Sequence, residues 1–182
     1  MIRDLLGILN KDWARLVSFS NLKLSSEFKL KYILNYKFLP VILIRTAFFT
    51  SGKFCSIPSK LCLFILHLFY NIEYTTKCAI GPGLVLPHPN SIIIGAYKIG
   101  NNTTIFNEVT IGAKYPDPDF IPDFRPILKD NCNIFCGARV LGSIVLSDRC
   151  SVGANSVVLK DCDIDSVYAG IPARKVNSKI LL

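Results

Sequence analysis

An aliphatic residue recurs at every sixth position over much of the chain between residues 80 and 158, and this period constrains the fold more than any other feature. The second half of the run is unbroken, with Leu128, Ile134, Val140, Leu146, Val152 and Val158. The first half has Ile80, Leu86 and Ile92, slips by one residue, and resumes at Ile99, Ile105 and Ile111. A period of six fits neither an α-helix nor an ordinary strand, so it indicates a structural repeat.

Hexapeptide repeats of this kind build a parallel β-helix, in which each hexad forms a short strand and a turn and three hexads complete one coil. The aliphatic residue points inward and stacks on its equivalents in neighbouring coils. Most of these residues are followed, four positions later, by a small residue suited to a tight corner: Thr103, Cys132, Ala138, Cys150 and Ser156. We therefore expect a β-helix over residues 73–166 and a C-terminal tail over residues 167–182.

The first 72 residues are expected to form an α-helical region. Apolar spacing predicts an amphipathic helix over Ile2–Val17. Three further helical segments are predicted, namely Glu27–Leu39 ending at Pro40, Val41–Thr50 and Lys60–Ile72. The apolar runs reach only about half the ~20 residues of a membrane span, so insertion is not expected. These helices are expected to pack on the first coil. Peripheral contact with the inner membrane is the less favoured alternative, and the lysines within the helical region are compatible with it.

Charge and cysteine usage narrow the partners and the compartment. The formal net charge of +8 favours an anionic partner, such as a phosphorylated cofactor, an acidic glycan or a bilayer surface. No stretch interleaves basic residues with stacking aromatics, so nucleic acid is not expected. The seven cysteines include no CxxC pair, and Cys132 and Cys150 occupy corner positions. This pattern indicates buried, reduced thiols in a cytoplasmic protein, and the N-terminus has no signal-peptide core.

The repeat is interrupted once, by the segment Gly112–Pro126 with the sequence GAKYPDPDFIPDFRP. Four prolines and three aspartates rule out a regular strand, so residues 112–126 are predicted to leave one corner of a coil as a loop. Long loops carried by a rigid scaffold are common places for functional residues.

Two histidines are present, and one of them is a candidate general base. His67 lies in an apolar helical run and is expected to be packed or at an interface. His88 lies between Pro87 and Pro89, which hold the backbone rigid; a rigid neutral imidazole suits proton removal from a hydroxyl, although a chance surface histidine fits equally well. Glu73 precedes it by fifteen residues, close to one coil of eighteen, and could orient the ring. A zinc site of the carbonic anhydrase type needs three histidines, so no metal is expected.

With these residues the chain resembles hexapeptide-repeat acyltransferases of the serine acetyltransferase type, over about residues 72–176. The motifs that carry the resemblance are IGPGLVLPHPNSIIIG (Ile80–Gly95), VGANSVVLKD (Val152–Asp161) and AGIPARKV (Ala169–Val176). The resemblance implies a mainly β fold, a left-handed parallel β-helix with an N-terminal α-helical region. It also implies acetyl-CoA as co-substrate, a homotrimer with active sites between subunits, and catalytic roles for His88 and Glu73.

The resemblance further implies a groove for acetyl-CoA between two columns of coil residues. Small residues that would let the pantetheine arm approach the backbone are Gly137, Ala138, Gly153 and Ala154. Basic residues that would meet the nucleotide phosphates are Lys160, Arg174 and Lys175. Corners of a β-helix need such glycines regardless of any ligand.

The chain departs from the serine acetyltransferase pattern around the acceptor. Pro87 stands where the family has an aspartate, and Phe124–Arg125 replaces an Arg–His pair that helps to hold the amino acid. Charged ends of serine left unpaired would cost binding energy. The chain is therefore predicted to acetylate a sugar hydroxyl of a bacterial surface polysaccharide, of the colanic acid, capsule or O-antigen type, or of its precursor. Predicted acceptor contacts are Asn90, Tyr115, Asp117, Phe124 and Arg125. The alternatives are a serine O-acetyltransferase and a non-catalytic β-helix scaffold.

Overall fold

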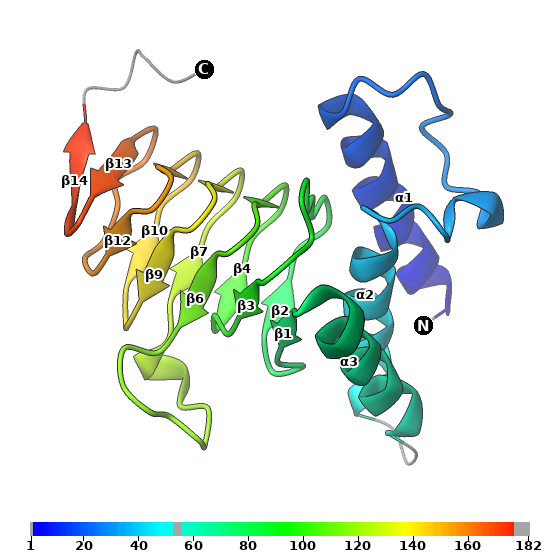
Figure 1. The fold of residues 1–182 in the computed structure, drawn as a ribbon, viewed down its shortest axis with the longest axis horizontal. Coiled ribbons are helices and arrows are strands. Elements are labelled where there is room, and N and C mark those ends of the chain that lie inside the picture. Colours follow the sequence, from blue (N-terminus) through cyan, green and yellow to red (C-terminus); the bar gives the residue numbers. More distant parts are fainter. Residues whose placement is uncertain (1, 53–55, 177–182) are drawn as a thin grey trace.

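The protein is a left-handed parallel β-helix covered at one end by α-helices, as the sequence predicts. The computed structural model describes residues 2–52 and 56–176. Figure 1 shows the helices beside β1 and β2 at the first coil, and β13 and β14 at the opposite end. The interrupting loop projects sideways from the strand β6, between these two ends.

Three sheets form the sides of the β-helix. Sheet A contains β1 (Glu73–Tyr74), β3 (Ile93–Ile94), β6 (Thr110–Gly112), β9 (Arg139–Leu141) and β12 (Val157–Val158). Sheet B contains β2 (Ala79–Ile80), β4 (Lys98–Ile99), β7 (Ile127–Leu128) and β10 (Val145–Leu146). Sheet C contains β5 (Thr104–Ile105), β8 (Asn133–Ile134), β11 (Ser151–Val152), β13 (Val167–Gly170) and β14 (Ala173–Val176). Among the described strands only β14 is antiparallel, and it pairs with β13.

The six-residue period is confirmed as the inward-facing core. Each aliphatic residue of the period is at most 9% exposed. Equivalent residues align from coil to coil, and Ile111 pairs in register with Val140. In the preceding coil the partner of Ile111 is Ile94 and not Ile92 of the predicted period, although Ile92 is buried as well. The predicted small corner residues, including Cys132 and Ser156, are buried as well. Burial of these stacked side chains is the main stabilising force of the β-helix.

Residues with positive φ turn the chain at two of the three corners. Those before successive strands of sheet C are Asn102, Asn131, Arg149 and Asp165, and those before strands of sheet A are Ser91, Glu108, Gly137 and Asn155. Each lies two residues before its strand, and asparagine tolerates the left-handed region better than most residues. Gly137 cannot be replaced without strain, because a Cβ there would lie 2.0 Å from Asn155 Oδ1.

The N-terminal helices are α1 (Ile2–Phe19), α2 (Leu39–Ser51) and α3 (Ile57–Tyr70). The predicted helix over 27–39 is wrong, since only a 3₁₀ turn (Leu30–Tyr32) forms there. Pro40 is the second residue of α2 and does not end a helix, because proline fits the first helical turn, where its missing N–H would have no partner. The Asn35 side chain accepts hydrogen bonds from the amides of Lys37 and Phe38 just before α2. Among the described helices, none combines the length and apolarity that crossing a bilayer requires.

A buried ion pair fastens α1 and α2 to the first coil. Arg45 donates to both carboxylate oxygens of Asp12, at 2.9 and 3.0 Å, and the two side chains are almost fully buried. Arg45 also donates to the carbonyls of Ile80 and Gly81. Asp12 in turn accepts from the amides of Gly83 and Leu84, at 2.6 and 2.9 Å. The helices therefore cover the open end of the β-helix through polar groups that are all hydrogen-bonded.

The cysteines are largely buried, as predicted. Five of the six described cysteines are buried, whereas Cys136 is exposed at a corner and Cys55 lies outside the described residues. Burial raises the pKa of Cys78 to about 12, so this thiol stays protonated near neutral pH.

Replacing Arg45 with methionine is expected to lower the free energy of unfolding by about 3–5 kcal/mol, because Asp12 would remain buried without its partner. Urea unfolding followed by circular dichroism measures this loss. The matched control is Arg149→Met, which removes an ion pair with Asp165 whose two side chains are more than half exposed. Equal destabilisation by the two substitutions would contradict the importance of the buried pair.

Candidate functional site

His88 lies at the corner between sheets C and A in the first coil. It follows Val85, which bridges to Thr104 of sheet C, and precedes β3. Pro87 and Pro89 are buried while His88 is exposed, so the prolines anchor the backbone and the imidazole faces outward. Within the described residues the imidazole makes no hydrogen bond, and its ring neighbour is Phe106, with centroids 6.2 Å apart.

A column of outward-facing residues runs from His88 across successive coils. The Phe106 and Phe135 rings stack at 5.1 Å, and the register of β8 with β11 sets Gly153 beside Phe135. A Cβ on Gly153 would lie 3.2 Å from that of Ala169. Ala169 pairs in turn with Arg174 across β13 and β14. We call this set the corner column: His88, Phe106, Phe135, Gly153, Ala169 and Arg174.

The corner column is a continuous surface with one cation at its far end. Four coil-to-coil steps of about 4.8 Å separate His88 from Ala169, roughly 19 Å in total. Arg174 shares a face with Ala169, because residues directly opposite on paired strands point the same way. A ligand with an extended, mostly apolar part and an anionic group at one end would match this surface, which is mostly apolar and ends at a cation.

The predicted cofactor residues divide between the corner column and other positions. Gly153 and Arg174 belong to the column, and Ala154 follows Gly153 at the exposed corner. Lys175 instead forms an ion pair with Asp163 at 2.8 Å, since adjacent residues of a strand face opposite sides. Lys160 follows β12 on the corner between sheets A and B, away from the column.

Gly137 and Ala138 form the corner before β9. The side chain of Ala138 is buried in the core, so only its backbone could meet a ligand. The glycine at 137 is explained by its φ of +70° and its close approach to Asn155. Neither residue needs a ligand to account for its identity.

Glu73 opens β1 on the outer surface of sheet A. It pairs in register with Ile93, one coil above, and its carboxylate is exposed. Residues 89–92 turn the corner between Ile93 and His88, and Asn71 donates to Ser91 there. No hydrogen bond joins Glu73 to His88 within the described chain. The predicted pairing, in which one coil brings Glu73 under the His88 ring, therefore remains a prediction.

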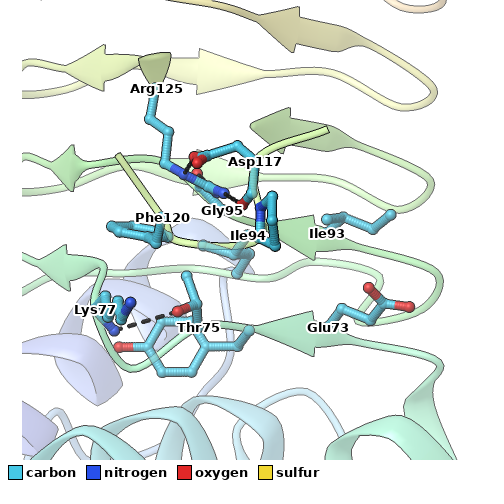
Figure 2. A pocket seen from close by; sticks show the side chains of 11 residues that line it. Glu73, Thr75, Lys77, Ile93, Ile94, Gly95, Asp117, Phe120 and Arg125 are labelled. Atoms are coloured by element: carbon cyan, nitrogen blue, oxygen red, sulfur yellow. Dashed lines mark hydrogen bonds and ion pairs between the residues drawn. The ribbon is translucent and has the colours of Figure 1, made fainter. Parts of the chain in front are cut away.

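A cavity of about 370 Å³ lies between Glu73 and the loop 112–126, and we call it the loop cavity. Figure 2 shows Arg125 and Asp117 above Phe120, with Thr75 between Lys77 and Glu73 on the strand below. The Arg125 Nε donates to Asp117 Oδ2 at 2.8 Å, and Nη1 donates to the carbonyl of Gly95 at 2.8 Å. The Arg125 guanidinium lies 4.0 Å from the centroid of the Phe120 ring.

The Arg125–Asp117 ion pair holds the loop in shape. Their side chains are 13% and 2% exposed, and both Asp117 oxygens also accept from the amide of Ile121. Burial alone would raise the pKa of Asp117, but the Ile121 amide and the Arg125 guanidinium outweigh it and leave the pKa below its usual value. Because each group already satisfies the other, these two predicted acceptor residues are committed to the loop itself. Gly95 allows the approach, since a Cβ there would lie 3.0 Å from Arg125 Nη1.

Lys77 is a cavity residue that the sequence interpretation missed. Its Nζ donates to the carbonyl of Asp119 at 3.0 Å and lies 5.5 Å from the centroid of the Phe120 ring. The coil length could have indicated this position. Lys77 lies at the corner between sheets A and B, and the loop leaves the same corner two coils later.

The remaining predicted acceptor residues lie elsewhere. Tyr115 and Phe124, 72% and 53% exposed, line a separate apolar cavity of about 290 Å³ with Lys114, Gly142 and Ser143. Asn90 lies beside His88, where its amide donates to the His88 carbonyl at 2.8 Å. His67 is exposed on α3 and not packed in the core. In the described part of the chain no group of three His, Cys, Asp or Glu side chains could hold a metal ion.

Comparison with curated proteins finds serine acetyltransferases. The chain is 36% identical to the enzyme of Bacillus subtilis over 113 residues, which is 62% of this chain and 51% of that protein. It is 34% identical to the enzyme of Staphylococcus xylosus over 114 residues, with the same shares of the two chains. The chain thus spans about half the length of the curated relatives it matches. No model of a known protein family matches it.

Comparison with solved structures supports the fold. The serine acetyltransferase of Neisseria gonorrhoeae superposes with a TM-score of 0.81 at 19% identity, covering 99% of this chain and 69% of that one. The soybean serine acetyltransferase apoenzyme superposes with a TM-score of 0.77 at 25% identity, covering 93% and 69%. A serine acetyltransferase in complex with CoA gives a TM-score of 0.78 at 21% identity, covering 96% and 70%.

Replacing Arg125 with methionine is expected to loosen the loop, because Asp117 would lose its charged partner and Gly95 its donor. Hydrogen exchange of the Ile121 and Phe124 amides should quicken by at least about tenfold, the factor for a charged hydrogen bond worth about 1.5 kcal/mol. The control Lys129→Met changes an exposed residue outside the loop. If these amides exchanged as slowly in the Arg125 variant as in the wild type, Arg125 would not be holding the loop in shape.

Proposed function

We propose that this chain is an acetyl-CoA-dependent O-acetyltransferase. The observation that carries the proposal is the corner column, which joins the outward imidazole of His88 to the Arg174 guanidinium through an aromatic and glycine surface. Arg174 forms no ion pair with the residues that the structure describes. Its sequence similarity to serine acetyltransferases supports the same activity. Arg174 would meet the nucleotide phosphates, and Phe106 and Phe135 would pack against the pantetheine arm.

In the proposed mechanism His88 acts as a general base. The neutral imidazole takes the proton of the acceptor hydroxyl as that oxygen attacks the thioester carbonyl. The new ester C–O bond forms, the C–S bond breaks, and the imidazolium returns its proton to the departing CoA sulfur. Glu73 would stabilise the imidazolium. Backbone amides at the corner are suited to stabilise the oxyanion.

The proposed active site lies between subunits of a homotrimer, as the resemblance to serine acetyltransferases implies. Exposed apolar side chains on α3, namely Ile57, Leu61, Phe64 and Leu68, offer the helical region a further contact surface. Peripheral contact of this region with the inner membrane stays part of the proposal, as does action in the cytoplasm.

L-Serine is the acceptor that the comparisons favour, because the reported relatives are all serine acetyltransferases. A sugar hydroxyl is the second candidate. It is favoured by Arg125, which is committed to Asp117 and Gly95, and by the exposed aromatic rings of Tyr115 and Phe124, which suit the apolar face of a sugar.

Replacing His88 with alanine is expected to reduce kcat by about 10²–10⁴-fold, the usual contribution of a general base. Release of CoA, followed by thiol titration, measures the rate. His67→Ala is the matched control, because it removes the other histidine from an exposed helix surface. Full activity in the His88 variant would overturn the mechanism.

The acceptor is tested by supplying acetyl-CoA with L-serine or with hexose and uronic acid acceptors in parallel. Mass spectrometry of the products is expected to detect O-acetylserine at the highest kcat/KM. Preferred acetylation of a sugar would select the second candidate. Failure to release CoA with every acceptor, together with no binding of acetyl-CoA in calorimetry, would instead favour a non-catalytic scaffold.

A further inference from the structure

The loop cavity contains four charged side chains, and only two of them are neutralised. Asp117 and Arg125 form the buried ion pair that frames the loop. Glu73 and Lys77 line the same cavity, and neither forms an ion pair in the described chain. In Figure 2 they lie on opposite sides of Thr75. The cavity is therefore dipolar, with the Glu73 carboxylate at one side and the Lys77 ammonium at the other.

Lys77 is held in place and keeps unused hydrogen-bonding capacity. The Asp119 carbonyl accepts one of its three N–H groups, and the Phe120 ring faces its charge. Both contacts come from the loop that Arg125 and Asp117 hold in shape. Two N–H groups remain for a ligand, so the ammonium is a preorganised anion-binding group at the cavity wall.

We propose that Lys77 binds a carboxylate of the acceptor and so selects hydroxy acids over neutral alcohols. This inference rests on the proposed O-acetyltransferase function and names its acceptor class. The cavity of about 370 Å³ is within the size range of small-molecule sites and is ample for an amino acid. L-Serine fits this chemistry directly, because it joins a hydroxyl to a carboxylate. A neutral sugar would leave the Lys77 ammonium without an anionic partner.

Lys77 would thereby replace cations that the loop cannot supply. The Arg125 guanidinium donates to Asp117 and Gly95, and the adjacent Phe124 carries no charge. Lys77 is the remaining cation among the described residues that line the cavity. A cation that selects the acceptor need not belong to the loop. It only has to lie where the anionic group of the acceptor binds.

The test compares binding of L-serine with binding of L-serinamide, which keeps the hydroxyl and the amine but lacks the carboxylate. Chemical shift perturbation in NMR titrations gives both dissociation constants for the wild-type chain, Lys77→Gln and the control Lys98→Gln. Lys98 is an exposed lysine on the outer surface of sheet B. The wild type and the control are expected to prefer L-serine by about tenfold, the factor for a charged hydrogen bond of about 1.5 kcal/mol. In Lys77→Gln the preference should vanish while serinamide binding stays unchanged.

Two outcomes would overturn the assignment of Lys77. One is an unchanged preference for L-serine in Lys77→Gln, and the other is a wild-type chain that does not distinguish the two ligands. Because binding is measured without turnover, it separates this inference from the proposed function. If Lys77 selects L-serine as expected but the chain releases no CoA from acetyl-CoA, acetyl transfer is rejected and the carboxylate site stands. Acetyl transfer to L-serine by Lys77→Gln at the wild-type KM would reject Lys77 alone.

Discussion

Coil-to-coil stacking of inward aliphatic side chains is the constraint on which the rest of the structure depends. The register that stacks Ile105, Ile134 and Val152 also fixes the next residue of each strand, which points outward. Phe106, Phe135 and Gly153 are therefore aligned beside His88 because their inward neighbours are aligned. A rigid core of this kind holds candidate site residues within a narrow geometry, although they come from distant parts of the sequence.

Polar interactions hold the two parts of the fold that the repeat does not stabilise, namely the N-terminal helices and the loop 112–126. The first coil exposes an open edge, and the Asp12–Arg45 pair attaches α1 and α2 over it without leaving a buried polar side chain unpaired. The loop 112–126 has no repeat to hold it, and the Arg125–Asp117 pair with the Gly95 carbonyl gives it a fixed shape. The same fixed loop positions Lys77, so one ion pair links the loop's structure to its proposed selectivity.

The sequence predicts the β-helix well because a period of six can only describe a repeat, and its apolar residues are the core. It predicts the helix over 27–39 wrongly, because a proline in the first turn of α2 resembles a proline that ends the preceding segment. Motifs make His88 and Arg174 candidate site residues, and their surroundings follow from the register. They could not show that Arg125 is already bound by Asp117, nor that Lys77 faces the cavity, since both depend on the path of an irregular loop.

A structure of the chain bound to CoA tests the central proposal most directly. We expect the pantetheine arm along the corner column, with the sulfur within reach of His88, the arm against Phe106 and Phe135, and the nucleotide phosphates at Arg174. In an assembly of subunits, Glu73 and the loop cavity should face the same sulfur. CoA bound away from the corner column, or with its sulfur far from every His88 imidazole, would contradict the proposed O-acetyltransferase site.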